Sequence, residues 1–210
     1  MRKLFFFLFL LATCLVYGQS PIVSEASTLQ PALQQLGHRL LRHKTGSIVA
    51  IEPATGRVLC LVTNSSAGEN LDLALATPYP PGSTMKTAEA LMLYSEGIID
   101  DNTSVGCQGG FRTGNIRVKC HQHRSPLRLT NALAYSCNTW FLSTFIRMMN
   151  DKERYADKDE AIATWNRYMR SMGLGGPTGI DLPGEKGGLL ANPNYLRRRY
   201  KDGWNAQTIM

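Results

Sequence analysis

Two short motifs in this chain bring together side chains that can carry out nucleophilic chemistry. Ser83 is followed three residues later by Lys86, and Ser136 is followed two residues later by Asn138. Residues three apart are neighbours on a helix, so the first motif places a hydroxyl beside an amine. A serine becomes nucleophilic when a nearby base takes its proton, and a lysine whose pKa is lowered by burial can be that base. The two motifs together predict an activated serine that acts as a nucleophile.

The elements that must position these residues are indicated by turn residues and apolar spacing. Residues 79–82 (Tyr-Pro-Pro-Gly) must be extended or turned, because proline disfavours helix in the residue before it. We therefore expect a helix that begins near Ser83, whose free backbone N–H groups suit a developing oxyanion. A second helix is expected over residues 127–133, ending near Ser136, and a third over residues 138–149.

The remaining elements follow from the same patterns. Leucines at three- or four-residue spacing predict a helix within residues 20–43, and residues 47–52 and 57–62 form two β-rich runs joined by a Pro- and Gly-containing turn, which predicts a hairpin. Five further segments have weaker signals. They are two short strands around 109–110 and 114–115, a charged solvated connection over 150–161, a helix over 163–172, and an irregular Gly- and Pro-rich stretch over 173–193.

The composition indicates a folded protein with a basic surface. The chain has 210 residues, 43% of them hydrophobic and 19% charged, which is ordinary for a globular protein and excludes intrinsic disorder. Its net charge of +7 suits anionic polymers or lipids in principle. No nucleic-acid motif is present, and no aromatic residues are interleaved with the basic ones. We therefore expect no nucleic-acid partner.

The N-terminus has the order of an export signal. Residues 1–3 include two positive charges, at Arg2 and Lys3. Residues 4–16 form an apolar run of 13 residues, and small or polar residues follow. This run is shorter than the roughly 20 residues of a spanning helix. We predict that residues 1–19 are a signal peptide or a short membrane anchor, with a lipoprotein linkage through Cys14 as a further alternative. Each of these places the rest of the chain in the periplasm or at the membrane.

The cysteines allow several interpretations. Cys60 alternates with apolar neighbours and is expected in the core, and core packing is also the expectation for Cys137. Cys107 and Cys120 bracket a hairpin-like stretch and can form a disulfide in an exported protein. Alternatively, these two thiols bind zinc together with the neighbouring histidines, or they remain unbonded. The histidines in question are His121 and His123.

Four segments, in this order, resemble the penicillin-binding protein transpeptidase family. Residues 46–59 resemble its opening hairpin, 79–86 its nucleophile segment, 136–138 its second motif, and 178–185 a further signature. The resemblance extends from about residue 44 to the end and is strongest to the class B proteins of the penicillin-binding protein 2 type. It implies an α/β (α+β) fold with an antiparallel sheet flanked by helices and a helical lobe.

The resemblance also implies a role for each motif residue. Ser83 would attack the penultimate D-alanine carbonyl of a peptidoglycan stem peptide, with Lys86 as general base. Ser136 would relay a proton to the leaving amine, and Asn138 would hold the substrate amide. β-Lactams would acylate the same serine, membrane proteins of cell elongation would be partners, and the reaction would need no cofactor or metal.

Two departures from the family pattern qualify this expectation. The family's third motif, Lys-Thr/Ser-Gly, does not occur after Asn138, whereas residues 44–46 spell it before the nucleophile, where they are expected to form the turn that leads into the first strand. The family's long N-terminal domain is also missing. We therefore expect residues 44–210 to be a transpeptidase domain truncated at its C-terminal side, preceded by a helical lead-in at residues 20–43.

Two other functions stay open on the sequence alone. A serine β-lactamase would need a positioned base to hydrolyse the acyl-enzyme, and Glu185, in a Gly-rich loop, is the acidic residue we considered for that role. A truncated remnant that binds ligands without turnover is the second alternative, favoured by the abrupt apolar C-terminus.

Overall fold

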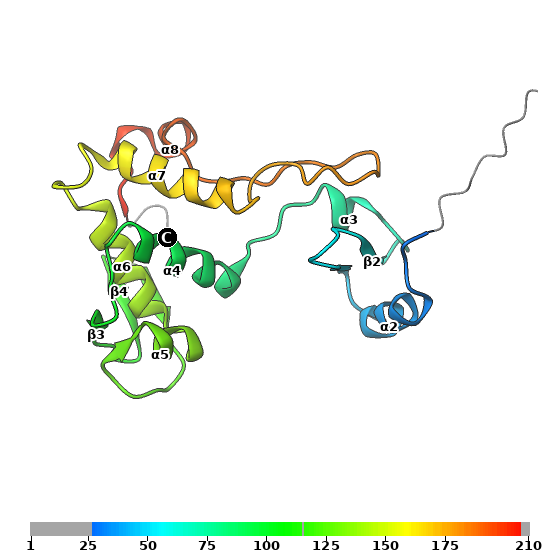
Figure 1. Cartoon of the computed structure of the whole chain (residues 1–210), viewed down its shortest axis with the longest axis horizontal. Coiled ribbons are helices and arrows are strands. Elements are labelled where there is room, and N and C mark those ends of the chain that lie inside the picture. Colours follow the sequence, from blue (N-terminus) through cyan, green and yellow to red (C-terminus); the bar gives the residue numbers. More distant parts are fainter. Residues whose placement is uncertain (1–26, 115, 207–210) are drawn as a thin grey trace, which may run out of the picture. The chain divides into compact units, whose positions relative to one another are not determined.

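The computed structural model describes residues 27–114 and 116–206, which belong to two compact units, Met1–Ala74 and Leu75–Met210 (Figure 1). The expected signal peptide or anchor at residues 1–19 lies outside the described residues. Among the helices of the described part, none has the length and apolar character needed to cross a membrane.

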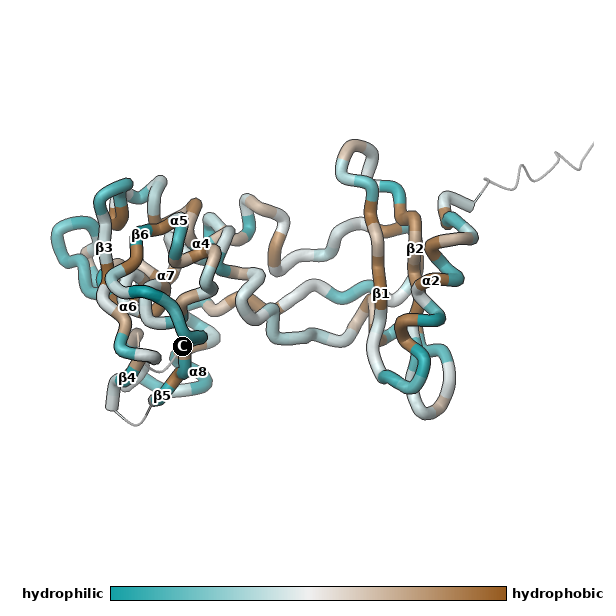
Figure 2. Tube along the Cα trace, turned by 90° about the horizontal axis from the view of Figure 1, so that it is seen from below, coloured by the Kyte–Doolittle hydropathy of each residue, from teal (hydrophilic) through white to brown (hydrophobic). Residues whose placement is uncertain are grey.

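The first unit packs one helix on a β-hairpin. Its elements are α2 (Pro31–Leu41), β1 (Gly46–Ile51) and β2 (Val58–Asn64), followed by the short α3 (Asp72–Leu75). The strands pair antiparallel, with Ser47 opposite Thr63, so the predicted hairpin is confirmed. Apolar residues colour much of both strands in Figure 2. The core of the unit consists of Leu41, Cys60 and Val62.

A glycine and an amide fix α2 against β2. A Cβ on Gly37 would lie 2.9 Å from Val62 Cγ2 and 3.2 Å from Cys60 Sγ, so only a residue without a side chain lets the helix come this close. Gln34 adds two hydrogen bonds with the backbone of Leu61, because its Nε2 donates to the carbonyl at 3.1 Å and its Oε1 accepts from the amide at 2.7 Å. Cys60 is buried in this core, as the sequence indicates.

The second unit is mostly helical and carries both motifs. Its elements are η1 (Gly82–Thr84), α4 (Met85–Ser95), β3 (Ser104–Val105), β4 (Gly110–Thr113), β5 (Ile116–Lys119), β6 (Leu127–Arg128), α5 (Leu129–Ala134), α6 (Asn138–Met149), α7 (Lys158–Ser171), α8 (Pro193–Tyr200) and η2 (Lys201–Gly203). Helix α6 is central, since it contacts α4, α7 and strands β3, β4 and β5. It buries Trp140 and Phe141 against Met92 and Leu93 of α4.

Most predicted elements are present, and the differences have local causes. Within the described residues the strands form three two-stranded antiparallel ladders, β1–β2, β3–β6 and β4–β5. The charged stretch 150–161 is not all connection, because Asp157 caps α7 by accepting a hydrogen bond from Glu160 N, and the helix therefore begins at Lys158. Helix α8, which we did not predict, begins with the same device at Asn192.

Candidate active site

Ser83 and Lys86 occupy the first turn of the segment that we predicted to be helical. Ser83 lies in η1, is exposed, and precedes α4, whereas Lys86 lies in the first turn of α4 and is only 8% exposed. Lys86 Nζ is 3.0 Å from Ser83 Oγ, which confirms that the two side chains are neighbours. The serine therefore faces solvent while its neighbouring amine is buried behind it.

Ser136 is held in an unusual backbone conformation at the end of α5. Its φ is +50°, a left-handed conformation that costs a non-glycine residue about 1–2 kcal/mol. Ser136 N donates to Leu133 O at 3.0 Å, and Cys137 N donates to Ala132 O at 2.9 Å. These two bonds form a Schellman motif, which satisfies the last carbonyls of α5. The turn leads directly from α5 into α6, and so places Ser136 and Asn138 beside Lys86.

Asn138, the first residue of α6, is oriented by contacts on both sides of its amide. Oδ1 accepts a hydrogen bond from Lys86 Nζ at 2.6 Å, and Nδ2 donates to the backbone carbonyl of Lys119 in β5 at 2.8 Å. The opposite assignment of O and N would leave two donors facing each other at Lys86 and two acceptors at Lys119. The amide orientation is therefore fixed by its partners.

Lys86 is the centre of the network. Its Nζ lies 2.9 Å from Ser136 Oγ and 2.8 Å from Ser136 O, in addition to its contacts with Ser83 and Asn138. Ser136 Oγ in turn donates to Ser83 Oγ at 2.9 Å. Two of these partners, Ser136 O and Asn138 Oδ1, can only accept hydrogen bonds. A neutral amine can satisfy both with its two N–H groups and still direct its lone pair at a serine hydroxyl.

Burial favours the neutral form of this amine. It lowers the pKa of Lys86 below the usual 10.5, although negative charge on Cys120, Cys137 or Glu89 would oppose the shift. Burial also raises the pKa of Glu89, one turn further along α4, from 4.5 to about 7, against the opposing charge of Lys86. The site therefore contains an amine and a carboxyl whose charges are both disfavoured by burial.

The structure brings all four predicted site residues together, although they come from two motifs about fifty residues apart. The triplet at residues 44–46 and the residue Glu185, which were also considered from the sequence, form contacts away from this site. Lys44 Nζ donates to Leu40 O at 2.8 Å, at the end of α2, and Gly46 begins β1, in agreement with a turn before the strand. Glu185 accepts hydrogen bonds from the backbone N–H groups of Thr178 and Gly179, which fold the loop around it.

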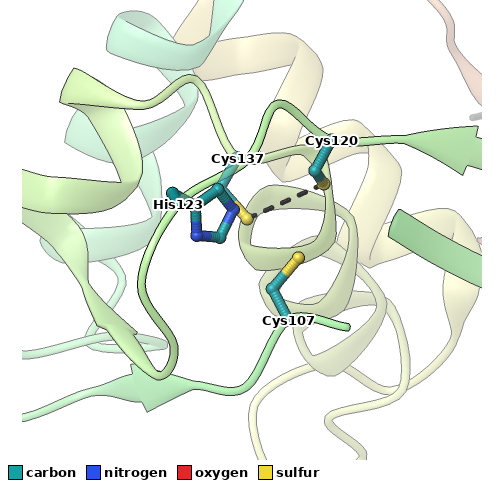
Figure 3. Close-up of side chains that lie close together, drawn as sticks. All are labelled: Cys107, Cys120, His123 and Cys137. Carbon is teal, nitrogen blue, oxygen red and sulfur yellow. Dashed lines mark hydrogen bonds between the residues drawn. The ribbon is translucent and has the colours of Figure 1, made fainter. Parts of the chain in front are cut away.

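A cluster of sulfur and nitrogen atoms lies beside this site, and its membership differs from our prediction. The side chains of Cys107, Cys120, His123 and Cys137 converge, and one possible ligand atom from each lies within 4.8 Å of all the others (Figure 3). His121 is exposed and does not take part. Cys137, expected only as core packing, is buried but directs its thiol into this cluster.

The Cys107–Cys120 disulfide, one of the alternatives that the sequence leaves open, is not formed, because all four cysteines of the described residues are free thiols. Cys107 Sγ and Cys120 Sγ both contact Thr139 Oγ1, at 3.2 and 3.3 Å. Cys120 Sγ also accepts from Thr139 N, at the start of α6. Burial raises the pKa of Cys120, but the hydrogen bonds with Thr139, Cys107 and Cys137 together outweigh it and bring the pKa down to about 7.

The cluster fits a tetrahedral zinc ion. The Sγ atoms of Cys120 and Cys137 are 3.9 Å apart, and two thiolates about 2.3 Å from one zinc ion at the tetrahedral angle would be about 3.8 Å apart. His123 Nδ1 lies 2.6 Å from Arg124 O, so this nitrogen donates and Nε2 carries the lone pair. His123 Nε2 is buried, and no residue of the described part forms a hydrogen bond with it. An unpaired buried acceptor beside three thiols is what a metal ligand set requires.

The comparisons with known proteins agree with this geometry. The family model described as the penicillin binding protein transpeptidase domain matches residues 46–204. The chain therefore belongs to the penicillin-binding protein transpeptidase family, and the predicted resemblance is confirmed.

Within this family the similarity is to class B proteins of the penicillin-binding protein 2 type. The chain is 30% identical to the peptidoglycan D,D-transpeptidase MrdA of Acinetobacter baumannii and 27% identical to that of Escherichia coli K12. Each comparison covers 84% of this chain but only 28% and 30% of the relative. The chain thus spans less than a third of the length of these relatives.

Solved structures confirm the predicted fold class. Penicillin-binding protein 2 of Helicobacter pylori has a TM-score of 0.69 with 19% identity, over 86% of this chain and 37% of that one. The Pseudomonas aeruginosa protein of the same name has a TM-score of 0.66 with 24% identity, over 85% of this chain and 44% of the other. These likenesses establish the α/β transpeptidase fold for the part of it that this chain contains.

Proposed function

We propose that this chain is the part of a peptidoglycan D,D-transpeptidase that carries the nucleophile, and that the reaction proceeds through an acyl-enzyme on Ser83. The observation that carries the proposal is the position of Lys86 Nζ, within hydrogen-bond distance of both serine hydroxyls. Relatives named peptidoglycan D,D-transpeptidase support the overall reaction.

The acylation step uses the network as a proton path. Ser83 Oγ attacks the carbonyl of the penultimate D-alanine as its proton passes to the neutral amine of Lys86. The tetrahedral intermediate then collapses, and the C–N bond to the terminal D-alanine breaks. The departing nitrogen receives the proton from Lys86 through the hydroxyl of Ser136, which lies 2.9 Å from both Lys86 Nζ and Ser83 Oγ. Free D-alanine leaves, and the peptide remains as an ester on Ser83.

Transfer to the acceptor reverses this path. The amine of a neighbouring stem peptide attacks the ester carbonyl and gives up a proton through Ser136 to Lys86. Ser83 Oγ leaves with that proton, which regenerates the free enzyme and forms the cross-link. Asn138, with its amide held by Lys119 O, keeps Lys86 pointed at the two hydroxyls. We propose that it also holds the substrate amide.

The test is acylation by a fluorescent penicillin, followed by gel and by intact mass. We expect one adduct per chain on the parent and none on Ser83→Ala. Ser95→Ala, an exposed serine at the end of the same helix, is the matched control and should acylate like the parent. An adduct that persists in Ser83→Ala would place the nucleophile elsewhere. A folded parent that forms no adduct would favour the remnant that binds without turnover.

No contact in the described residues favours the β-lactamase alternative. That function requires a base that activates water against the acyl-enzyme, and Glu185 is instead engaged by the loop at Thr178 and Gly179. Its hydrogen bonds with Thr178 lower the pKa of the Glu185 carboxyl, so it is a weak base. Rapid turnover of a chromogenic β-lactam, in place of a stable adduct, would support this alternative.

We further propose that the chain works in the periplasm, exported by residues 1–19 and either released or anchored at the membrane. Its substrates would be stem peptides ending in D-Ala-D-Ala. Partners from the cell-elongation machinery are proposed because a structural neighbour is the complex of penicillin-binding protein 2 with MreC from Helicobacter pylori. Fractionation of cells that express the tagged chain would test the compartment, and co-purification would test the partner.

A further inference from the structure

The segment around Ser136 carries most of the net positive charge of the chain. Residues 102–150 contain six lysine or arginine residues and no aspartate or glutamate. The six are Arg112, Arg117, Lys119, Arg124, Arg128 and Arg147. Since the net charge of the whole chain is +7, the rest of the sequence is close to neutral. A local excess of one sign attracts ligands of the opposite charge, so this segment suits an anionic ligand.

Three of these cations share one face of the hairpin that β4 and β5 form. Arg112 of β4 lies directly opposite Arg117 of β5. Cys120 N donates to Gly109 O at 3.1 Å, which makes these two residues a hydrogen-bonded pair. Because the two kinds of pair alternate along an antiparallel ladder, Arg112 and Arg117 form a non-hydrogen-bonded pair, in which cross-strand side chains come closest. Lys119 lies two residues after Arg117 and therefore points to the same face.

No anionic side chain of the described residues balances this cationic face, which consists of Arg112, Arg117 and Lys119. All three residues are exposed, and none of the ion pairs found in the described part of the chain includes them. The other face of the hairpin is apolar, with Phe111 buried and Val118 half-buried. Like charges directly opposite each other destabilise a ladder, and a bound anion would remove this cost.

The cationic face begins beside the catalytic amide. The carbonyl of Lys119 accepts the hydrogen bond from Asn138 Nδ2 at 2.8 Å, and Asn138 Oδ1 in turn contacts Lys86. Strand β4, which lies beside α6 in Figure 1, and strand β5 both contact this helix. Arg117 is two residues from Lys119 along β5, a distance of about 7 Å that two or three residues of an extended peptide span. A short peptide that reaches Ser83 is therefore long enough to reach this face.

We propose that the cationic face binds a carboxylate of the acceptor stem peptide. The proposal rests on the proposed function, in which a second stem peptide brings its amine to the ester on Ser83. This peptide also ends in D-Ala-D-Ala, so it carries a terminal carboxylate. The neutral amine of Lys86 offers no charge to that group. An arginine guanidinium does, and it binds a carboxylate through two parallel hydrogen bonds.

The order of the reaction assigns this face to the acceptor. The donor loses its terminal carboxylate with the departing D-alanine, so in the acyl-enzyme only the incoming peptide has this group. A cavity of about 640 Å³ adjoins the face, and Arg112 lines it together with the polar residues Gln108 and Ser125. Binding there holds the acceptor near the ester and lowers the concentration of acceptor that transfer needs.

The experiment measures peptide binding by isothermal titration calorimetry and does not require turnover. The full chain, with Ser83 first acylated by penicillin to fill the donor position, is titrated with a soluble stem peptide that ends in D-Ala-D-Ala. The same peptide with its terminal carboxylate amidated should bind about fivefold more weakly, as expected for the loss of one exposed ion pair. If the chain does not acylate, the titration is made on the free chain, so failure of the proposed function is a separate result.

A double variant and a matched control test which side chains bind the carboxylate. Arg112→Gln combined with Arg117→Gln should weaken binding of the carboxylate peptide by about fivefold and leave the amidated peptide unaffected. The control combines Arg57→Gln with Arg198→Gln, which removes two exposed arginines outside residues 102–150. It changes the net charge equally and should bind both peptides like the parent.

Two further readouts separate this role from a structural one and from donor binding. The unfolding temperature of the Arg112/Arg117 double variant should equal or exceed that of the parent, because a like-charge pair is removed. Penicillin, which carries its own carboxylate, should acylate this variant within about twofold of the parent rate. A lower unfolding temperature would instead mean that the arginines support the hairpin, and slower acylation would assign them to the donor.

Three results of the titration would overturn the proposal. The first is equal binding of the two peptides to the parent, and the second is an equal loss of affinity in the control variant. The third is an absence of peptide binding together with retention of the parent, but not of the Arg112/Arg117 double variant, on phosphatidylglycerol vesicles. That result would make the cationic face a contact with anionic lipid.

Discussion

Replacing Lys86 by methionine tests the role of the buried amine most directly. Methionine has a similar length and suits a side chain that is only 8% exposed, so the substitution removes the amine with little change in volume. It breaks the contacts of Nζ with Ser83, Ser136 and Asn138. The hydrogen bond between the two serine hydroxyls remains, but no base is left to accept the proton.

The expected loss is large in rate and small in stability. A positioned general base contributes about 10²–10⁴-fold to a proton-transfer step, so acylation should slow by that factor. The Asn138 and Ser136 oxygens each lose a donor, at about 1–3 kcal/mol where water cannot replace it. The removed amine was itself disfavoured by burial, which offsets part of that loss. We therefore expect the unfolding free energy to fall by no more than about 3 kcal/mol.

The assay is the rate of acylation by a fluorescent penicillin, measured by quenched time points at several drug concentrations. Circular dichroism and thermal unfolding of each variant show whether it is folded. Lys152→Met, which removes an exposed lysine, is the matched control and should keep the parent rate. If folded Lys86→Met acylates within about fivefold of the parent, well short of the loss of a general base, Lys86 is not the base.

Three further measurements test the electrostatics and packing of the second unit. The rate of acylation should rise with pH, and the midpoint of this rise should lie below pH 10.5. The reason is that only the neutral Lys86 amine accepts the proton and burial lowers its pKa. The parent should lose stability between pH 4.5 and about 7, because the buried carboxyl of Glu89 ionises more readily in the unfolded chain, and Glu89→Gln should remove this loss. At pH 8 the substitution should raise the free energy of unfolding, measured in urea, by up to about 3 kcal/mol. Gly175→Ala should lower the unfolding temperature more than Gly173→Ala, since both have φ above +80° but only the Gly175 Cβ would clash, at 2.6 Å, with Leu190.

The lowered pKa of Lys86 also determines how the stability of the folded protein changes with pH. A lysine whose pKa is lower in the folded state holds fewer protons there than in the unfolded chain between the two pKa values. Stability therefore rises with pH through that window, toward 10.5, as the cost of burying the charged amine disappears. The denaturation midpoint of the parent should therefore rise relative to that of Lys86→Met as pH increases through this window. Parallel midpoints at all pH values would contradict burial of a charged amine.

Local chemistry in the sequence was sufficient to predict much of the fold. The helix after residues 79–82, the hairpin near residues 47–62 and the span of α6 all follow from turn residues and apolar periodicity, which act over a few residues. Two helix starts also have local signals in the sequence, but we did not use them to predict these helices. Asp157 and Asn192 are ordinary capping residues, and they mark the starts of α7 and α8.

By itself, the sequence determined which residues could do the chemistry, because Ser83 and Lys86 share a helical turn wherever that helix packs. Only the tertiary structure decided which partners they meet. The left-handed turn at Ser136 and the packing of α6 against α4 bring Asn138 to Lys86 across 52 residues of chain. The same packing brings Cys137, and not His121, to the other thiols. Contacts between distant segments depend on how whole helices pack in a shared core, and residue spacing along the chain does not encode them.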